Sequence, residues 1–265
     1  RGSATYLFYG QSEPFTSDAM SQQPAAKLEG VLAAEPLGDV DGDALGDAIL
    51  AGDGMRILPG SRQRRSGDVP AAALVQIDGP SSFLASHEGP SAVGDLDQDG
   101  YADFMLRTDR IEGAGVDVHG RYSSLVYGAP DLLDGRPLGS ENVSAIFDPR
   151  ASGWLAPVGD WDADGNADLL FFHYTWVEGQ LYGEIAKDEL LLLRGESTRF
   201  AGVFEAPLLG EGDDPGVGLE LSSLTRLGDI DGDGFADLSV TANGPAGRSR
   251  AFVKYGSSVP VSAIR

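Results

Sequence analysis

The sequence predicts an all-β fold built from four copies of one unit, and three observations support this. A nine-residue acidic motif occurs four times in the 265 residues. Short apolar or β-branched runs, such as Ala48-Ile49-Leu50 and Phe104-Met105-Leu106, follow the copies and are typical of β-strands. The 37 glycines and 15 prolines supply turns, whereas continuous helical periodicity is nearly absent.

The acidic motif reads Gly-Asp-x-Asp-x-Asp and carries a fourth aspartate further on. Counted from the first aspartate, carboxylates stand at positions 1, 3, 5 and 9. Carboxylates this close together repel one another unless a cation neutralises them. Calcium takes roughly six to eight oxygen ligands, and such a loop offers these side chains and the backbone carbonyl of position 7. The predicted calcium ligands are Asp39, Asp41, Asp43, Leu45 and Asp47; Asp95, Asp97, Asp99, Tyr101 and Asp103; Asp160, Asp162, Asp164, Asn166 and Asp168; and Asp229, Asp231, Asp233, Phe235 and Asp237.

Other metal assignments fit the sequence less well. Magnesium prefers strict octahedral geometry and keeps its waters, and an EF-hand needs a glutamate at position 12 between two helices. The absence of cysteine and the presence of only 3 histidines leave zinc few ligands. Position 6, which makes the sharp turn, is Ala44 in the first copy and glycine in the others, whereas Ala163 at position 4 is a milder change. We therefore expect three to four calcium ions (Ca²⁺), with the first loop as the weakest site.

The motif belongs to a longer pattern. Each loop is followed by a strand, a hairpin and a strand that ends in an aromatic-glycine pair, as at Tyr127-Gly128 and Tyr255-Gly256; Arg194-Gly195 and Pro59-Gly60 are weaker equivalents. This pattern resembles the FG-GAP repeats of integrin α-subunit β-propellers and their bacterial relatives, over roughly residues 31 to 256. The resemblance implies a calcium-stabilised β-propeller.

We expect a single β-propeller domain over residues 1–265, with four blades. Successive motifs start 56, 65 and 69 residues apart, which fits a blade of four strands. A larger ring of five to seven blades, of which this chain is a part, is the alternative. Residues 1–30 are expected to be a closure segment, because Ala4–Tyr9 matches the strand that ends each later repeat. The repeats are placed at about 31–85, 86–150, 151–215 and 216–265, with inner strands at Val31–Ala34, Phe83–Ala85, Trp154–Ala156 and Leu221–Leu224.

Composition bounds the partners. A formal charge of −22 argues against nucleic acid and against anionic membrane surfaces. No apolar run approaches ~18 residues, so we expect no membrane insertion. Weak calcium sites fill at the roughly millimolar calcium found outside cells, which favours a secreted or cell-surface location. An open sheet edge would allow a homo-oligomer.

We expect the chain not to be an enzyme. Nearly saturated calcium shells leave no open position for a substrate, and His87, His119 and His173 stand in unlike contexts without a nucleophile partner. The resemblance implies an extracellular module for adhesion or recognition of a protein or glycan ligand, with calcium in a structural role. The alternatives are an accessory propeller that targets a secreted hydrolase, and a calcium-dependent lectin that uses the aromatic stretch Phe171–Trp176. A basic stretch, Arg62–Arg65, is expected at a solvated hairpin tip.

Overall fold

The computed structural model shows an all-β protein. It describes residues 4–10, 24–78, 91–108, 122–148, 153–176, 185–196, 198–205, 220–244 and 248–257. This part of the chain contains β-strands and two short 3₁₀ turns, η2 (Ala71–Ala73) and η4 (Ser140–Asn142). None of its helical segments has the length and apolarity needed to cross a membrane.

Four sheets begin with the same antiparallel arrangement of three consecutive strands. We call these arrangements repeats 1 to 4, and in each of them the acidic motif connects the first strand to the second. The connecting segments, residues 39–46, 95–102, 160–167 and 229–236, are called loops 1 to 4. The strands are β3 (Val31–Gly38), β4 (Asp47–Gly52) and β5 (Met55–Leu58); β8 (Ser91–Gly94), β9 (Asp103–Thr108) and β10 (Tyr122–Val126); β12 (Gly153–Gly159), β13 (Asp168–Trp176) and β14 (Ile185–Leu193); and β16 (Glu220–Gly228), β17 (Asp237–Gly244) and β18 (Arg248–Lys254).

These strands confirm the predicted position of the motif between two strands. The inner strands of repeats 1, 3 and 4 contain the predicted segments, and the inner strand of repeat 2 is β8. The segment Phe83–Ala85, predicted for that strand, lies outside the described residues. Among the described residues, a fourth strand follows in two repeats: β7 (Val75–Ile77) pairs with β5, and β11 (Ala145–Asp148) pairs with β10.

After its third strand, each of repeats 1 to 3 returns to the sheet before it. Strand β6 (Gly67–Asp68) of repeat 1 pairs in parallel with β2 (Ala26–Glu29). Leu138 of repeat 2 forms a parallel bridge with Ile77 in β7, and β15 (Gly202–Glu205) of repeat 3 pairs in parallel with β11. Each of repeats 1 to 3 therefore pairs with the edge of the sheet before it.

The pairing of β6 with β2 corrects the prediction that the basic stretch forms a hairpin tip. The basic stretch Arg62–Arg65 is not a hairpin tip, because it lies between β5 and β6, and these strands belong to different sheets. The local sequence resembles a hairpin connection, but the pairing of β6 with the distant β2 decides its course.

The leading sheet resembles the outer half of the sheet of repeat 2. Strand β1 (Ala4–Leu7) pairs antiparallel with β2, and β2 pairs in parallel with β6. The order β1-β2-β6 therefore repeats the order β10-β11-β15, which consists of a third strand, a fourth strand and an added edge. The described part of residues 1–30 thus supplies a third and a fourth strand, in front of repeat 1.

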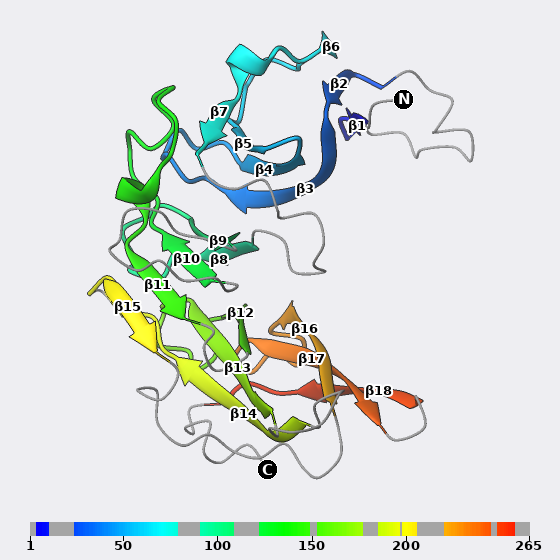
Figure 1. The fold of residues 1–265 in the computed structure, drawn as a ribbon, viewed down its shortest axis with the longest axis vertical. Coiled ribbons are helices and arrows are strands. Elements are labelled where there is room, and N and C mark those ends of the chain that lie inside the picture. The colour runs from blue at the N-terminus through cyan, green and yellow to red at the C-terminus, as the bar shows by residue number, and fades with distance from the viewer. Residues whose placement is uncertain are drawn as a thin grey trace.

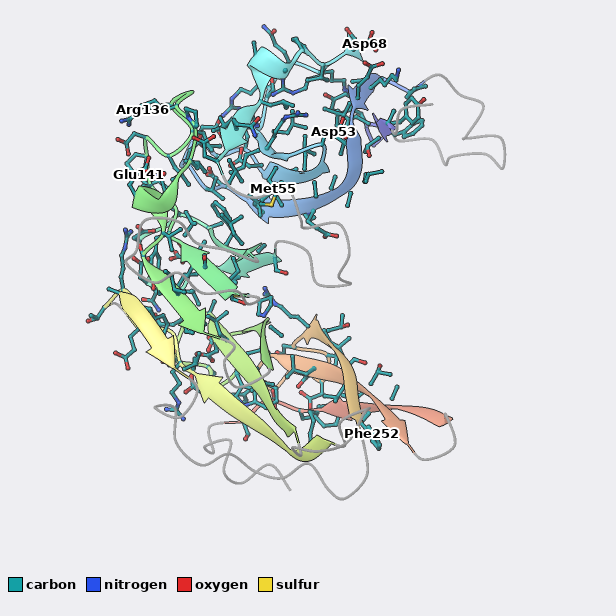
Figure 2. The ribbon with its side chains drawn as sticks, viewed as in Figure 1. Asp53, Met55, Asp68, Arg136, Glu141 and Phe252 are labelled. Carbon is teal, nitrogen blue, oxygen red and sulfur yellow. The ribbon has the colours of Figure 1, made fainter. Side chains whose placement is uncertain are left out.

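The hydrophobic core is divided into sections that lie between successive repeats. The inner strands β3, β8, β12 and β16 contact one another in that order, and the sheets follow an arc (Figure 1). One buried cluster joins repeats 1 and 2 and includes Met55, which is labelled in Figure 2. Two further clusters join repeats 2 and 3, and repeats 3 and 4. Each repeat is thus stabilised by its neighbours, but the described sheets do not close into a ring.

Candidate metal sites

Each of the four loops gathers carboxylates into a compact group. In loops 1 and 2 the group consists of positions 1, 3 and 5, and in loops 3 and 4 it consists of positions 1, 3 and 9. Within a group, one carboxylate oxygen of every member lies within 4.8 Å of the others. The groups are Asp39, Asp41 and Asp43; Asp95, Asp97 and Asp99; Asp160, Asp162 and Asp168; and Asp229, Asp231 and Asp237.

Backbone N–H groups of the loop hold the carboxylates of positions 1 and 5 in place. The N–H of position 6 donates to the position 1 carboxylate, at 2.9 Å in all four loops. The N–H of position 7 donates to the position 5 carboxylate at 2.8 to 3.0 Å, from Leu45, Tyr101, Asn166 and Phe235. The carbonyl oxygens of these four residues remain predicted ligands.

The loop backbone requires the left-handed conformation at positions 4 and 6. Position 4 has a positive φ in every copy, although it is Gln98 in loop 2 (57°) and Ala163 in loop 3 (58°). Position 6 is glycine in three copies, and Ala44 adopts the same conformation in loop 1, with φ 64°. A side chain with a Cβ is strained there. Loop 1 therefore keeps the shape of the other loops, at a conformational cost.

Replacing Ala44 with glycine is expected to raise the free energy of unfolding by about 1 kcal/mol, because glycine adopts a positive φ without steric strain. Urea unfolding of the wild type and the variant measures the difference. Ala48→Gly, in the ordinary strand β4, is the matched control and is expected to destabilise the protein. A destabilised Ala44→Gly variant would contradict the prediction.

Position 9 is a buried latch between the loop and the third strand of its own repeat. Asp103 is fully buried, and its two oxygens accept the N–H of Leu96 at 2.7 Å and the N–H of Gly128 at 2.9 Å. The other repeats make the same pair of bonds, with Asp47, Asp168 and Asp237 accepting from position 2 and from Gly60, Gly195 and Gly256, respectively.

These bonds explain the glycine that stands two residues after the end of each third strand. A Cβ on Gly128, Gly195 or Gly256 would collide with a backbone carbonyl of the adjacent loop, so the loop approaches closely only where the side chain is absent. The sequence pattern indicated a repeated glycine at this place, and the structure shows that its N–H holds the position 9 carboxylate.

Burial changes the electrostatics of this latch. Removal from water raises the pKa of Asp103 to about 7 and that of Asp168 to about 6; the other loop carboxylates add to the rise, whereas the backbone N–H donors oppose it. Burial also raises the pKa of Asp47 above its usual range. A cation beside these groups would favour their charged form.

Two arginines form ion pairs with loop carboxylates, and the sequence analysis predicted neither interaction. Arg199 donates from Nε to Asp97 and from Nη2 to Asp99, each at 2.5 Å, and Arg194 lies 3.1 Å from Asp162. Arg194 stands where repeats 2 and 4 have the tyrosine of the aromatic-glycine pair, which is a local signal. Arg199 is 100 residues from Asp99, so no local pattern identifies it.

The residues of these loops fit a hard divalent cation. Oδ1 of Asp162 is buried and has no hydrogen-bond partner among the described residues, and the side chain is 6% exposed. A buried carboxylate oxygen without a partner is costly, and a cation would satisfy it. The donors that the loops offer are all oxygen atoms, which is the chemistry that calcium prefers.

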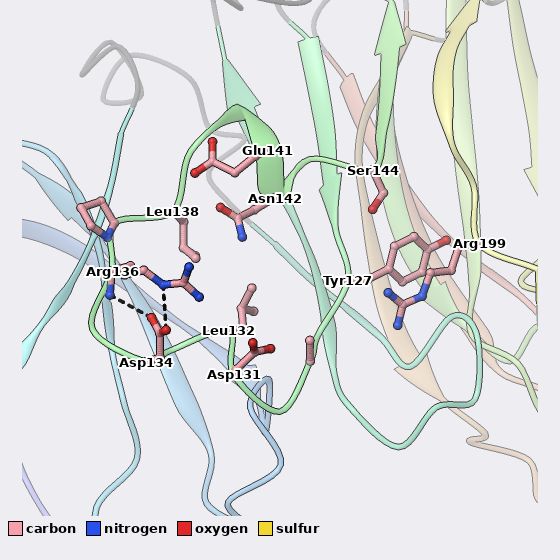
Figure 3. A pocket seen from close by; sticks show the side chains of 12 residues that line it. Tyr127, Asp131, Leu132, Asp134, Arg136, Leu138, Glu141, Asn142, Ser144 and Arg199 are labelled. Carbon is pink, nitrogen blue, oxygen red and sulfur yellow. Dashed lines mark hydrogen bonds and ion pairs between the residues drawn. The ribbon is translucent and has the colours of Figure 1, made fainter.

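A pocket of about 300 Å³ lies beside loop 2. Figure 3 shows Tyr127 and Arg199 on one side of it, and Asp131 and Arg136 on the other. Arg136 is paired with Asp134 at 2.7 Å. The pocket thus presents charges of both signs, and Arg199 connects it with loop 2.

The remaining candidate residues give no second centre in the described part of the chain. His87 and His119 lie outside the described residues, and His173 is in β13, as is the aromatic stretch Phe171–Trp176. No protein-family model and no curated protein matches the chain. The repeated acidic loop is therefore the feature from which a function has to be argued.

Proposed function

We infer that the chain is a non-catalytic calcium-binding module for recognition, with calcium in a structural role. The observation that carries this inference is the same carboxylate group at the same strand corner in four sheets. Turn-forming Asp-Gly sequences alone would not require a buried position 9 carboxylate, nor an unpaired buried oxygen on Asp162.

Calcium would act by locking each corner. The loop joins the first and second strands, and its position 9 carboxylate is bonded to the end of the third. A cation that gathers positions 1, 3, 5 and 9 and the position 7 carbonyl would tie three strands together and would relieve the repulsion between carboxylates. Such a shell leaves little room for a substrate, which supports a structural role over a catalytic one.

The repeats are proposed to be blades of a β-propeller. Inner strands that lie side by side, with core sections between successive sheets, support this arrangement. The sequence favoured a ring of four blades. The open arc favours the alternative, in which these four repeats are part of a larger ring (Figure 1).

The proposed ligand is a protein or a glycan outside the cell. The connections between strands and the charged pocket beside loop 2 are carried by a rigid scaffold, which is where binding residues concentrate. Tyr127, Arg136 and Asn142 in that pocket would also suit the hydroxyl groups of a sugar, which keeps a calcium-dependent lectin as the second candidate. A glycan array without hits in the presence of calcium would remove the lectin.

Calorimetric titration of metal-free protein with calcium tests the proposed sites, and we expect three to four bound ions. Asp231→Asn in loop 4 is expected to remove one of them, because position 3 belongs to the carboxylate group of that loop. Asp68→Asn, at an exposed aspartate outside the loops, is the matched control and should leave the count unchanged. The absence of binding at millimolar calcium would refute the calcium sites.

A further inference from the structure

One arginine bridges two carboxylates of loop 2. Nε of Arg199 donates to Oδ2 of Asp97, and Nη2 donates to Oδ2 of Asp99, both at 2.5 Å. The side chain of Asp97 is 4% exposed and that of Asp99 is 28% exposed. A guanidinium holds its donors in a rigid fork, so one group can satisfy two carboxylates at once. Arg199 therefore places a positive charge where loop 2 gathers its negative charges.

The two oxygen atoms that Arg199 occupies are the ones that a cation would need. At positions 3 and 5 of loops 1, 2 and 4, Oδ1 accepts a backbone N–H of the loop itself. Oδ2 is the remaining atom, and in loops 1 and 4 it has no hydrogen-bond or ion-pair partner among the described residues. In loop 2 both Oδ2 atoms are bonded to Arg199. A calcium ion at positions 3 and 5 of loop 2 would require the same atoms.

The arginine beside loop 3 leaves an oxygen open in its carboxylate group. Arg194 lies 3.1 Å from Oδ2 of Asp162 and contacts no second carboxylate in the described part of the chain. Oδ1 of Asp162 is buried and has no hydrogen-bond partner there. The side chains of Arg194 and Arg199 are 46% and 44% exposed. The two arginines thus match in charge and exposure, but only Arg199 spans two members of a carboxylate group.

A return connection holds Arg199 beside loop 2. The residue lies between β14 and β15 of repeat 3, whereas loop 2 belongs to repeat 2. The N–H of Phe200 donates to the Tyr127 hydroxyl at 2.8 Å, and the Arg199 guanidinium lies 4.8 Å from the ring centre of Tyr127 (Figure 3). A cation that is attached in this way competes with a dissolved ion at a high effective concentration.

We propose that Arg199 is a built-in competitor of calcium at loop 2, so that the ion has to displace the guanidinium before the loop can bind it. The proposal rests on the proposed calcium sites and adds the residue that sets the affinity of one of them. A site that is open only about a tenth of the time binds its ligand about tenfold more weakly. Loop 2 is therefore expected to fill at higher calcium concentrations than loop 4, which has the same glycine at position 6 and no arginine partner among the described residues.

The competition gives Arg199 different effects in the metal-free and the calcium-loaded protein. Without calcium, Arg199 relieves the repulsion between Asp97 and Asp99 and joins repeat 3 to repeat 2. With calcium bound, the ion neutralises these carboxylates, and the guanidinium is released to the pocket that it lines. Arg199 should therefore stabilise the metal-free protein more than the calcium-loaded protein.

Calorimetric titration of metal-free protein with calcium tests the competition. Asp95→Asn and Asp160→Asn, at position 1 of loops 2 and 3, identify the binding step of each loop. Arg199→Met removes the guanidinium and is expected to raise the calcium affinity of loop 2 at least about tenfold. Arg194→Met is the matched control, because it removes the same charge beside loop 3 without opening a bridged pair. Its effect on the affinity of loop 3 is expected to stay below about threefold, as for an exposed ion pair.

Arg199→Lys is the second variant, and it keeps the test decisive if the methionine variant does not fold. Lysine preserves the charge and the apolar stem but lacks the fork that bridges two carboxylates. We expect a gain in the calcium affinity of loop 2 that lies between those of the wild type and Arg199→Met.

The Nε–H resonance of Arg199 in nitrogen-15-labelled wild-type protein reports the displacement itself. We expect it to move toward the position of a solvent-exposed arginine at the calcium concentrations that fill loop 2. Arg136 provides the control resonance, since its Nε is paired with Asp134 at 2.7 Å, outside the loops. Urea unfolding adds a stability readout, in which Arg199→Met is expected to lower the midpoint of the metal-free protein more than that of the calcium-loaded protein.

The outcomes separate the competition from the calcium sites themselves. An unchanged affinity of loop 2 in both Arg199 variants, a gain no larger than that caused by Arg194→Met, or an Arg199 resonance that stays in place as loop 2 fills would overturn the proposal. Each of these results would leave the calcium sites standing. Absence of calcium binding in the wild type and in every variant would refute the sites, and the competition with them.

Discussion

Asp103→Ala is expected to lower the free energy of unfolding by about 3 to 5 kcal/mol, because it leaves two buried N–H groups without an acceptor. These groups belong to Leu96 in loop 2 and to Gly128 at the end of the third strand. The substitution would therefore release the corner of repeat 2 from its own sheet. Urea unfolding in calcium buffer measures the loss, where the variant would also lack one predicted calcium ligand.

The aspartate at the turn between β4 and β5 provides the matched control. Asp53 is exposed (Figure 2), and Asp53→Ala is expected to change stability by less than about 0.5 kcal/mol. Asp103→Asn preserves the shape and one acceptor oxygen but turns an amide NH₂ toward a backbone N–H, so an intermediate loss is expected. Equal stabilities of Asp103→Ala and Asp53→Ala would show that the position 9 carboxylate is not a latch.

In the metal-free protein, the free energy of unfolding is expected to fall steeply as the pH rises from about 4 to about 7. Burial raises the pKa of Asp103 from 3.8 to about 7 and that of Asp168 to about 6. A carboxyl group whose pKa is raised by folding binds its proton more tightly in the folded state. Its stabilising contribution is present below pH 3.8 and is lost as the pH passes through the folded-state pKa.

The size of this effect follows from the shift, since one pKa unit corresponds to about 1.4 kcal/mol. Two such groups make the expected loss several kcal/mol in metal-free protein. Bound calcium favours the charged carboxylates, so the calcium-loaded protein should show little of this slope, and the difference between the two forms should widen with pH. Each bound calcium ion would add about 2.7 kcal/mol to the free energy of unfolding when the free calcium concentration is 100 times the Kd of its site.

Urea unfolding of metal-free and calcium-loaded protein at pH 5, 6, 7 and 8 measures both slopes. Asp103→Asn cannot titrate, so this variant is expected to reduce the pH dependence of the metal-free form. A metal-free protein whose stability rises with pH over this range would contradict the burial-induced shift. A calcium-independent slope would contradict the position of the cation beside position 9.

Local sequence determined the acidic loop and the strands that flank it. Carboxylates at fixed spacing, glycines at positions of positive φ and apolar runs after the motif all act within a few residues, so their pattern is readable without a fold. The strain at Ala44 is of this kind, because its neighbours along the chain impose the left-handed turn. The all-β class follows from the same local signals.

Contacts between distant residues were decided only by the tertiary structure. The Asp103 latch spans 25 residues, Arg199 reaches a loop 100 residues away, and β6 pairs with a strand of another sheet instead of forming a hairpin with β5. Ile230 is apolar like its equivalents in the other three loops, yet it is exposed whereas they are buried. Burial depends on what packs against a side chain, and a residue's own sequence context does not contain its neighbour in space.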